Sequence, residues 1–102
     1  MGLLDLLGLG GKSDAIAEFI TKGAVIIDVR TVGEFASGHI QSSKNIPLDT
    51  LQSKIQDIKK SNKPVIACCR SGMRSAQATS ILKQNGIEAV NGGGWESLQR
   101  KL

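Results

Sequence analysis

Apolar residues along the chain follow two patterns that alternate from one end to the other. Runs rich in β-branched and other apolar residues, at positions 24–29 and 65–68, are typical of strands buried on both faces of a parallel sheet. Two more strands are predicted at residues 44–46 and 87–90, and a glycine-rich turn at residues 92–94.

Between these strands, apolar residues recur about every 3.6 positions, the spacing of one helix face. The first predicted helix begins at Ser13, a residue type that caps helices, and ends at Gly23. Four more helices are predicted at residues 32–37, 48–59, 75–84 and 95–101. This alternation indicates an α/β fold with a mainly parallel sheet of four to five strands and helices on both faces.

The first twelve residues lie outside this alternation. Leucines within residues 3–9 have the spacing of a short amphipathic helical turn, and Gly8, Gly10 and Gly11 end it quickly. We interpret residues 1–12 as a short N-terminal appendage that docks on the domain or frays, with a dimer or membrane-surface contact as the alternative. Residues 13–102 then form one domain.

The composition restricts the classes of function. The chain has 102 residues, 40% of them hydrophobic, and 13 Lys and Arg against 9 Asp and Glu, a net charge of +4, as expected of one small soluble domain. No apolar run approaches the roughly 18–20 residues of a membrane span, and the N-terminus lacks a signal-peptide pattern, so we expect a cytoplasmic protein. Aromatic residues make up 3% of the chain, too few for a base-stacking module, so no nucleic-acid partner is expected.

The only cysteines are the adjacent residues Cys68 and Cys69. A bridge between sequence neighbours would link no distant parts of a fold, so a disulfide framework is excluded and a reduced thiol protein is predicted. The chain has no C-x-x-C pair and a single histidine, so we expect no metal site, and no cofactor is indicated.

Cys69 stands at the carboxyl end of a predicted parallel strand, where α/β folds gather their sites. The loop that follows consists of Arg70, Ser71, Gly72, Met73 and Arg74. Its backbone amides and the start of the next helix can bind an anion, and its two arginines add positive charge. These effects favour thiolate over thiol, so we predict a lowered pKa and a nucleophilic role for Cys69. The alternative is an inert buried cysteine.

Three ordered motifs then resemble one family, the rhodanese-like sulfurtransferases. The segment from Cys69 to Ser75 resembles the active-site loop of that family. Four further segments resemble the amino-terminal signature of the family in order and spacing. They are Asp28-Val29-Arg30, Glu34-Phe35, Gly38-His39-Ile40 and Asn45-Ile46-Pro47. Residues 92–95 are similar to the carboxy-terminal turn of the family. The resemblance covers residue 13 to the end and implies a rhodanese-like three-layer sandwich.

The resemblance also implies a reaction. Cys69 would take a sulfane sulfur from thiosulfate or another persulfide donor, become a persulfide, and pass the sulfur to cyanide or a thiol. The amides of residues 70–74 would surround the bound sulfur, and Arg70 and Arg74 could hold the sulfite portion of thiosulfate. The expected partners are therefore a small sulfur-donor anion and a thiol or protein persulfide acceptor.

The length of the loop distinguishes sulfur transfer from phosphatase chemistry. Four residues separate Cys69 from Arg74, whereas the related tyrosine-type phosphatases have five, and the loop holds no acidic residue that could act as a general acid. Phosphatase or arsenate-type chemistry stays an alternative. A persulfide- or redox-sensing module and a partner-binding domain without turnover also stay open.

A group of charged and polar residues precedes the loop in sequence and is interpreted as a supporting scaffold. Its members are Asp28, Arg30, Glu34 and His39. We expect an ion-pair and turn network, with His39 hydrogen-bonded within its own turn; the alternative is that His39 acts as a base. Strand alternation turns Cys68 away from the side that Cys69 faces, so packing is its expected role, with attack on a Cys69 persulfide as the alternative.

Overall fold

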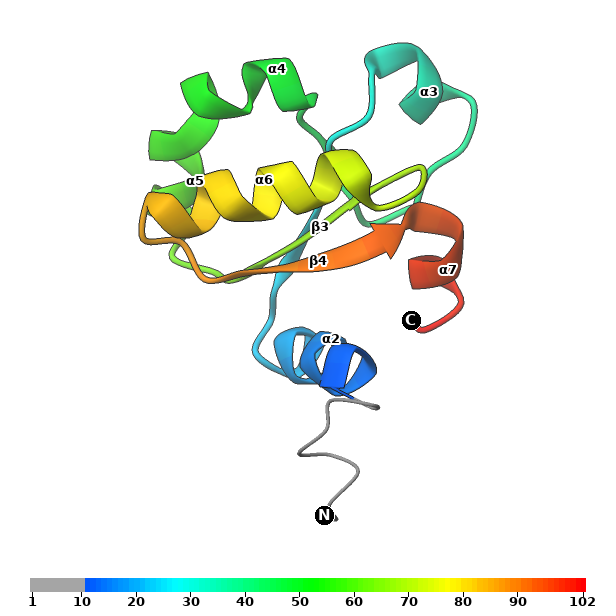
Figure 1. The fold of residues 1–102 in the computed structure, drawn as a ribbon, viewed down its shortest axis with the longest axis horizontal. Helices are drawn as coiled ribbons and strands as arrows, with labels where there is room; N and C mark the ends of the chain where they lie inside the picture. The colour runs from blue at the N-terminus through cyan, green and yellow to red at the C-terminus, as the bar shows by residue number, and fades with distance from the viewer. Residues whose placement is uncertain (1–10) are drawn as a thin grey trace.

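The computed structural model describes residues 11–102, with side chains from Ala15 onward, and Figure 1 shows their arrangement. The predicted appendage falls almost entirely on residues 1–10, which lie outside the described residues. The described chain forms a parallel sheet in the order β2-β1-β3-β4. Its strands are β1 (Val25–Asp28), β2 (Lys44–Asn45), β3 (Val65–Cys69) and β4 (Ala89–Gly94).

Helices connect the strands and cover both faces of the sheet. They are α2 (Gly11–Thr21), α3 (Val32–Ala36), α4 (Leu48–Leu51), α5 (Ile55–Ser61), α6 (Met73–Gln84) and α7 (Trp95–Gln99). In Figure 1, α4, α5 and α6 lie on one side of the sheet, and α2 and α7 lie on the other. No helix within residues 11–102 has both the length and the apolar character needed to cross a bilayer.

Two apolar clusters separate these three layers. On the α6 side, Leu51 and Leu82 pack with Ala67 and Cys69 of β3. On the other side, the cluster comprises Ile16, Phe19, Ile26, Ile40, Ile66, Cys68 and Leu98. Successive residues of β3 therefore serve opposite clusters, as the pleat of a strand covered on both faces requires. The predicted α/β fold is confirmed.

The glycine run that ends β4 continues the strand, so the predicted turn at residues 92–94 is wrong. Pairing with β3 shifts register between Ala67 and Cys68, because Gly92 is an extra residue in β4, a β-bulge. A Cβ on Gly92 would lie 2.8 Å from the Ile66 side chain, and a Cβ on Gly94 would lie 2.7 Å from the Arg70 carbonyl oxygen. Glycine is required at both positions because a neighbouring side chain or carbonyl oxygen leaves no room for a Cβ.

Several helix boundaries also differ from prediction. The helix expected at residues 48–59 is divided into α4 and α5 by a 3₁₀ turn, Gln52–Lys54. Hydrophobic spacing does not distinguish that turn from α-helix, because its tighter winding still leaves the flanking apolar residues buried. Helix α2 begins at Gly11 and α6 at Met73, so Ser13 does not cap its helix.

Candidate active site

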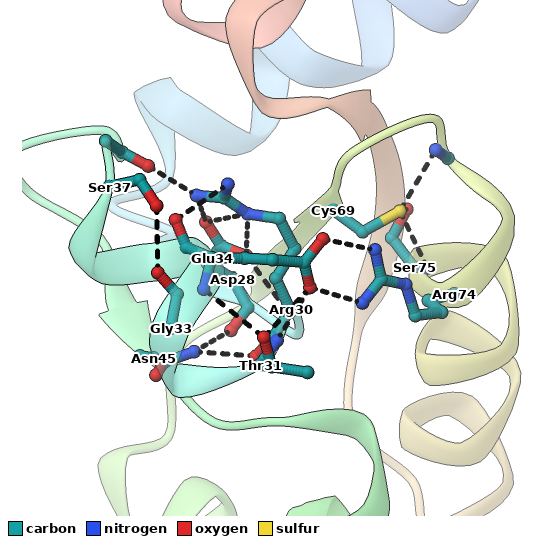
Figure 2. A network of polar contacts seen from close by, with 12 residues as sticks. Asp28, Arg30, Thr31, Gly33, Glu34, Ser37, Asn45, Cys69, Arg74 and Ser75 are labelled. Carbon is teal, nitrogen blue, oxygen red and sulfur yellow. Dashed lines mark hydrogen bonds and ion pairs between the residues drawn. The ribbon is translucent and has the colours of Figure 1, made fainter.

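Cys69 is the last residue of β3 and lies under the amino end of α6. Gly72 allows the chain to turn there, because its φ of 102° belongs to the left-handed region that glycine adopts freely. The Sγ atom of Cys69 accepts the backbone N–H of Gly72 at 3.0 Å and that of Ser75 at 3.4 Å. It also lies 3.3 Å from the Ser75 hydroxyl oxygen, and Figure 2 shows these contacts around the sulfur.

These contacts determine the ionisation of the thiol. Burial of Cys69 opposes the charged form, but hydrogen bonds from the Ser75 hydroxyl and from backbone N–H groups of the loop outweigh it, so the pKa of Cys69 is lowered. Burial raises the pKa of Cys68 to about 12, and the Asp28 carboxylate adds to the increase. The surroundings therefore shift the two thiols in opposite directions, toward easier loss of the proton at Cys69 and harder loss at Cys68.

A buried ion pair closes the end of β1. Asp28 is fully buried, and Arg30 Nη2 donates to its Oδ2 at 2.7 Å while Nε donates to Oδ1 at 3.0 Å. The same guanidinium donates to the carbonyl oxygen of Gly38 at 2.7 Å and lies 4.9 Å from the centre of the Trp95 ring. Arg30 thus holds β1, the loop after α3 and α7 together.

A second ion pair links α3 to α6 next to Cys69. Arg74 donates from Nη1 and Nη2 to the two carboxylate oxygens of Glu34, at 2.8 and 3.1 Å (Figure 2). Glu34 also completes a capping box with Thr31 at the start of α3. The bond from Arg74 and the backbone N–H of Thr31 lower the pKa of Glu34 to about 2.

The family of this fold is shown by comparison with known proteins. A model of the rhodanese-like domain family matches residues 12–101. The chain belongs to this family. The predicted family is therefore confirmed, and the fold described above is the rhodanese-like fold.

Individual relatives match this rhodanese-like chain over about two thirds of its length. An uncharacterized protein of Bacillus subtilis strain 168, YqhL, is 41% identical over 67 residues, which cover 66% of this chain and 52% of that protein. A protein of Allochromatium vinosum named sulfurtransferase is 35% identical over 70 residues, covering 69% of this chain and 64% of that protein. The chain thus spans about half to two thirds of the length of these relatives.

A solved structure extends the comparison to three dimensions. The crystal structure of a rhodanese-related protein from Thermoplasma volcanium matches with a TM-score of 0.70 at 32% identity. The match covers 87% of this chain and 88% of that chain.

The remaining predicted site residues of the rhodanese-like domain lie in different surroundings. Arg70 is exposed and lines a surface cavity of about 200 Å³ together with Trp95 and Glu96. Met73 is 78% exposed on the first turn of α6. His39 Nδ1 is 2.7 Å from the Phe35 carbonyl oxygen, and its ring stacks on the Phe35 ring at 3.7 Å. His39 is therefore held by the helix that precedes it.

Two polar side chains contribute to the site in ways that the sequence motifs do not indicate: Ser75 ends the loop motif without an assigned role, and Asn91 lies outside the motifs. The Ser75 hydroxyl lies against Cys69 and donates to Asn91 Oδ1 of β4 at 2.7 Å. Asn91 Nδ2 in turn donates to the Gly72 carbonyl oxygen at 3.1 Å. The available signal for Ser75 is its place in the first turn after the loop, whereas Asn91 follows the strand predicted at residues 87–90 and carries no such signal.

Proposed function

We propose that this rhodanese-like domain is a sulfurtransferase in which Cys69 carries a sulfane sulfur as a persulfide. The observation that supports this most directly is the set of polar groups around the buried Cys69 Sγ: the N–H groups of Gly72 and Ser75 donate to it, and the Ser75 hydroxyl oxygen lies 3.3 Å away. The similarity to the Allochromatium vinosum protein named sulfurtransferase supports the same activity class.

With thiosulfate as donor, the reaction has two steps. The Cys69 thiolate attacks the outer sulfur of thiosulfate; the S–S bond of thiosulfate breaks, a new S–S bond forms on Cys69, and sulfite leaves with the electron pair. Cyanide or a thiolate then attacks the terminal sulfur, and the Cys69 thiolate is regenerated. Both steps leave negative charge on sulfur, which the backbone donors of the loop stabilise.

The two arginines of the loop have different surroundings. Both terminal nitrogens of Arg74 are bound to Glu34, so Arg74 contributes charge near Cys69 without a free fork of donors for a phosphate. Arg70 is exposed and able to attract an anionic donor such as thiosulfate. Together with the four-residue spacing, this arrangement favours sulfur transfer over phosphatase chemistry.

The test is the intact mass of the protein after incubation with thiosulfate, followed by cyanide and an assay for thiocyanate. We expect wild type to gain the mass of one sulfur atom and to lose it to cyanide as thiocyanate. Cys69→Ser should gain nothing. Cys68→Ala is the matched control, because Cys68 lies in the opposite apolar cluster, and it should gain sulfur as wild type does.

Absence of added sulfur on folded, reduced wild type, with thiosulfate and with a persulfide donor, would contradict the proposal. Hydrolysis of an aryl phosphate without a sulfur donor would instead support a phosphatase. Oxidation of Cys69 without turnover would support a sensing module. The natural acceptor, a thiol or a protein persulfide, and the cytoplasmic location stay predictions.

A further inference from the structure

Asn91 connects β4 to both parts of the site that contact Cys69. Its Oδ1 accepts the Ser75 hydroxyl at 2.7 Å and the backbone N–H of Gly93 at 2.9 Å. Its Nδ2 donates to the carbonyl oxygen of Gly72 at 3.1 Å. The pairing of Asn91 with Ala67 places it on the same face of the sheet as Cys69, since alternate residues of a strand share a face.

The surroundings of Asn91 determine which way its amide points. The N–H of Gly93 can only donate and the carbonyl of Gly72 can only accept, so the oxygen must face Gly93 and the nitrogen must face Gly72. The amide oxygen has no proton to give. In the contact between Asn91 and Ser75, the single hydroxyl proton therefore belongs to the Ser75 side.

This direction has a consequence for Cys69. While the Ser75 proton points at Asn91, the Ser75 oxygen presents a lone pair to Sγ and can accept the S–H of the Cys69 thiol. Once the thiol has lost its proton to solvent, Sγ can only accept. The Ser75 hydroxyl then stabilises the thiolate only by rotating its proton from Asn91 to Sγ.

We propose that Asn91 is a positioning residue that holds the Ser75 hydroxyl toward itself and competes with the Cys69 thiolate for the hydroxyl proton. No proton leaves Ser75; its O–H bond rotates. Asn91 Oδ1 retains the N–H of Gly93 after the rotation, so the amide is not left without a donor. The inference rests on the proposed role of Cys69 as the sulfur-carrying thiolate.

Substitution of Asn91 leaves other hydrogen bonds that hold the loop in place. The Gly72 carbonyl oxygen also accepts the N–H of Ala76 at 3.0 Å, which belongs to the first turn of α6. The charged groups on the loop and on the elements beside it are Arg70, Arg74 with its partner Glu34 on α3, and the Asp28–Arg30 pair at the end of β1. A neutral replacement of Asn91 changes none of these charges.

The test measures the pKa of Cys69 from the pH dependence of its alkylation by iodoacetamide, with the modified residue identified by peptide mass. Asn91→Leu releases the Ser75 proton to the thiolate, so the pKa should fall and the thiolate fraction below the pKa should rise about three- to tenfold, the value of one hydrogen bond. Asn91→Asp adds a negative charge that Ser75 still binds, so the pKa should rise.

Repeating the measurement in the Ser75→Ala variant distinguishes an effect of Asn91 through the Ser75 hydroxyl from a purely structural effect. In Ser75→Ala, the hydroxyl is gone, so adding Asn91→Leu should leave the pKa of Cys69 unchanged. Asn85→Leu, at the far end of α6, is the matched control and should not alter the pKa. If Asn91→Leu unfolds the domain, Asn91→Ala removes the same acceptor with a smaller side chain.

A rise in the pKa with Asn91→Leu, or the same fall in the Ser75→Ala background, would overturn the inference and assign Asn91 to loop packing alone. The pKa of Cys69 is read without sulfur transfer. Failure of wild type to form a persulfide would therefore contradict the proposed function, while the measured pKa values would still decide the role of Asn91.

Discussion

Cys68 and Cys69 are adjacent on β3, are equally buried, and have opposite surroundings. Cys68 lies among apolar side chains, and burial followed by the Asp28 carboxylate raises its pKa to about 12. Cys69 faces the start of α6, where Ser75 and the loop amides lower its pKa against the cost of burial. Because the pleat turns neighbouring residues to opposite faces, the pKa is raised at one cysteine and lowered at the next.

Glu34 gives a prediction at the same scale. Pairing with Arg74 lowers the pKa of its carboxyl from an ordinary value of 4.5 to about 2 in the folded chain. The pairing therefore stabilises the fold above the ordinary pKa, and this contribution is lost as the pH falls toward 2. We expect Glu34→Gln to have a lower Tm than wild type at neutral pH, and the difference to shrink between about pH 4.5 and pH 2.

Glutamine keeps the capping box at the third position of α3, so this substitution removes charge and little else. Glu88→Gln, which breaks the exposed ion pair with Lys22, is the matched control and should have a smaller effect at neutral pH. Thermal unfolding followed by circular dichroism across this pH range measures the Tm difference of each variant from wild type. A Tm difference for Glu34→Gln that stayed constant with pH would mean that its charge does not stabilise the fold.

Some residues of the site could be predicted from the sequence, and others could not. Cys69 could be identified because an apolar strand, a short glycine-containing loop and a helix start all surround it in sequence. Asn91 could not, because its approach to Ser75 depends on the strand pairing of β4 with β3. Strand pairing joins residues that sequence spacing leaves far apart.

At the scale of elements, β4 shows why the glycine run was misread. Three consecutive glycines are typical of a turn, since glycine adopts left-handed φ freely, and Gly93 does so with a φ of 82°. Gly92 and Gly94 instead provide room for the Ile66 side chain and the Arg70 carbonyl. The apolar strands were predicted correctly because burial on both faces leaves a composition that is visible in sequence.

Gly94→Ala tests whether this close approach positions the loop. Its Cβ would lie 2.7 Å from the Arg70 carbonyl oxygen, and backbone at that distance must shift. We expect a loss of about 1–3 kcal/mol in the free energy of unfolding, the usual cost of overpacking. We also expect slower alkylation of Cys69 at neutral pH, because the loop donors move away from Sγ.

Gly33→Ala is the matched control, since a Cβ at Gly33 meets nothing within 4 Å and the residue lies in α3. It should leave both quantities close to wild type or increase the stability slightly. Urea unfolding and the alkylation rate measure the two effects. Equal behaviour of the two variants would show that β4 and the loop tolerate the extra methyl group.

At the scale of the whole molecule, Arg30 links parts of the chain that are far apart in sequence. Its guanidinium binds the Asp28 carboxylate at the end of β1, the Gly38 carbonyl in the loop after α3, and the ring of Trp95 at the start of α7. These elements border the site at the carboxyl edge of the sheet. One buried cation therefore joins three segments at that edge.

Removal of the Arg30 cation should lower the free energy of unfolding substantially. Arg30→Met keeps most of the side-chain volume but leaves the Asp28 carboxylate buried without its ion partner. We expect the free energy of unfolding to fall by about 3–5 kcal/mol, as for other buried pairs that lose one member. Urea unfolding followed by far-UV circular dichroism is the suitable measurement, because Trp95 fluorescence would respond directly to loss of the Arg30 contact.

Two further variants show whether the cost arises from the unpaired charge. Arg30→Met combined with Asp28→Leu removes both charges, so it should be more stable than Arg30→Met alone. Lys22→Met breaks the exposed pair with Glu88 and should cost less than about 1 kcal/mol. If Arg30→Met cost no more than Lys22→Met, the carboxyl edge of the sheet would be held by packing of its helices, and the buried ion pair would add little to it.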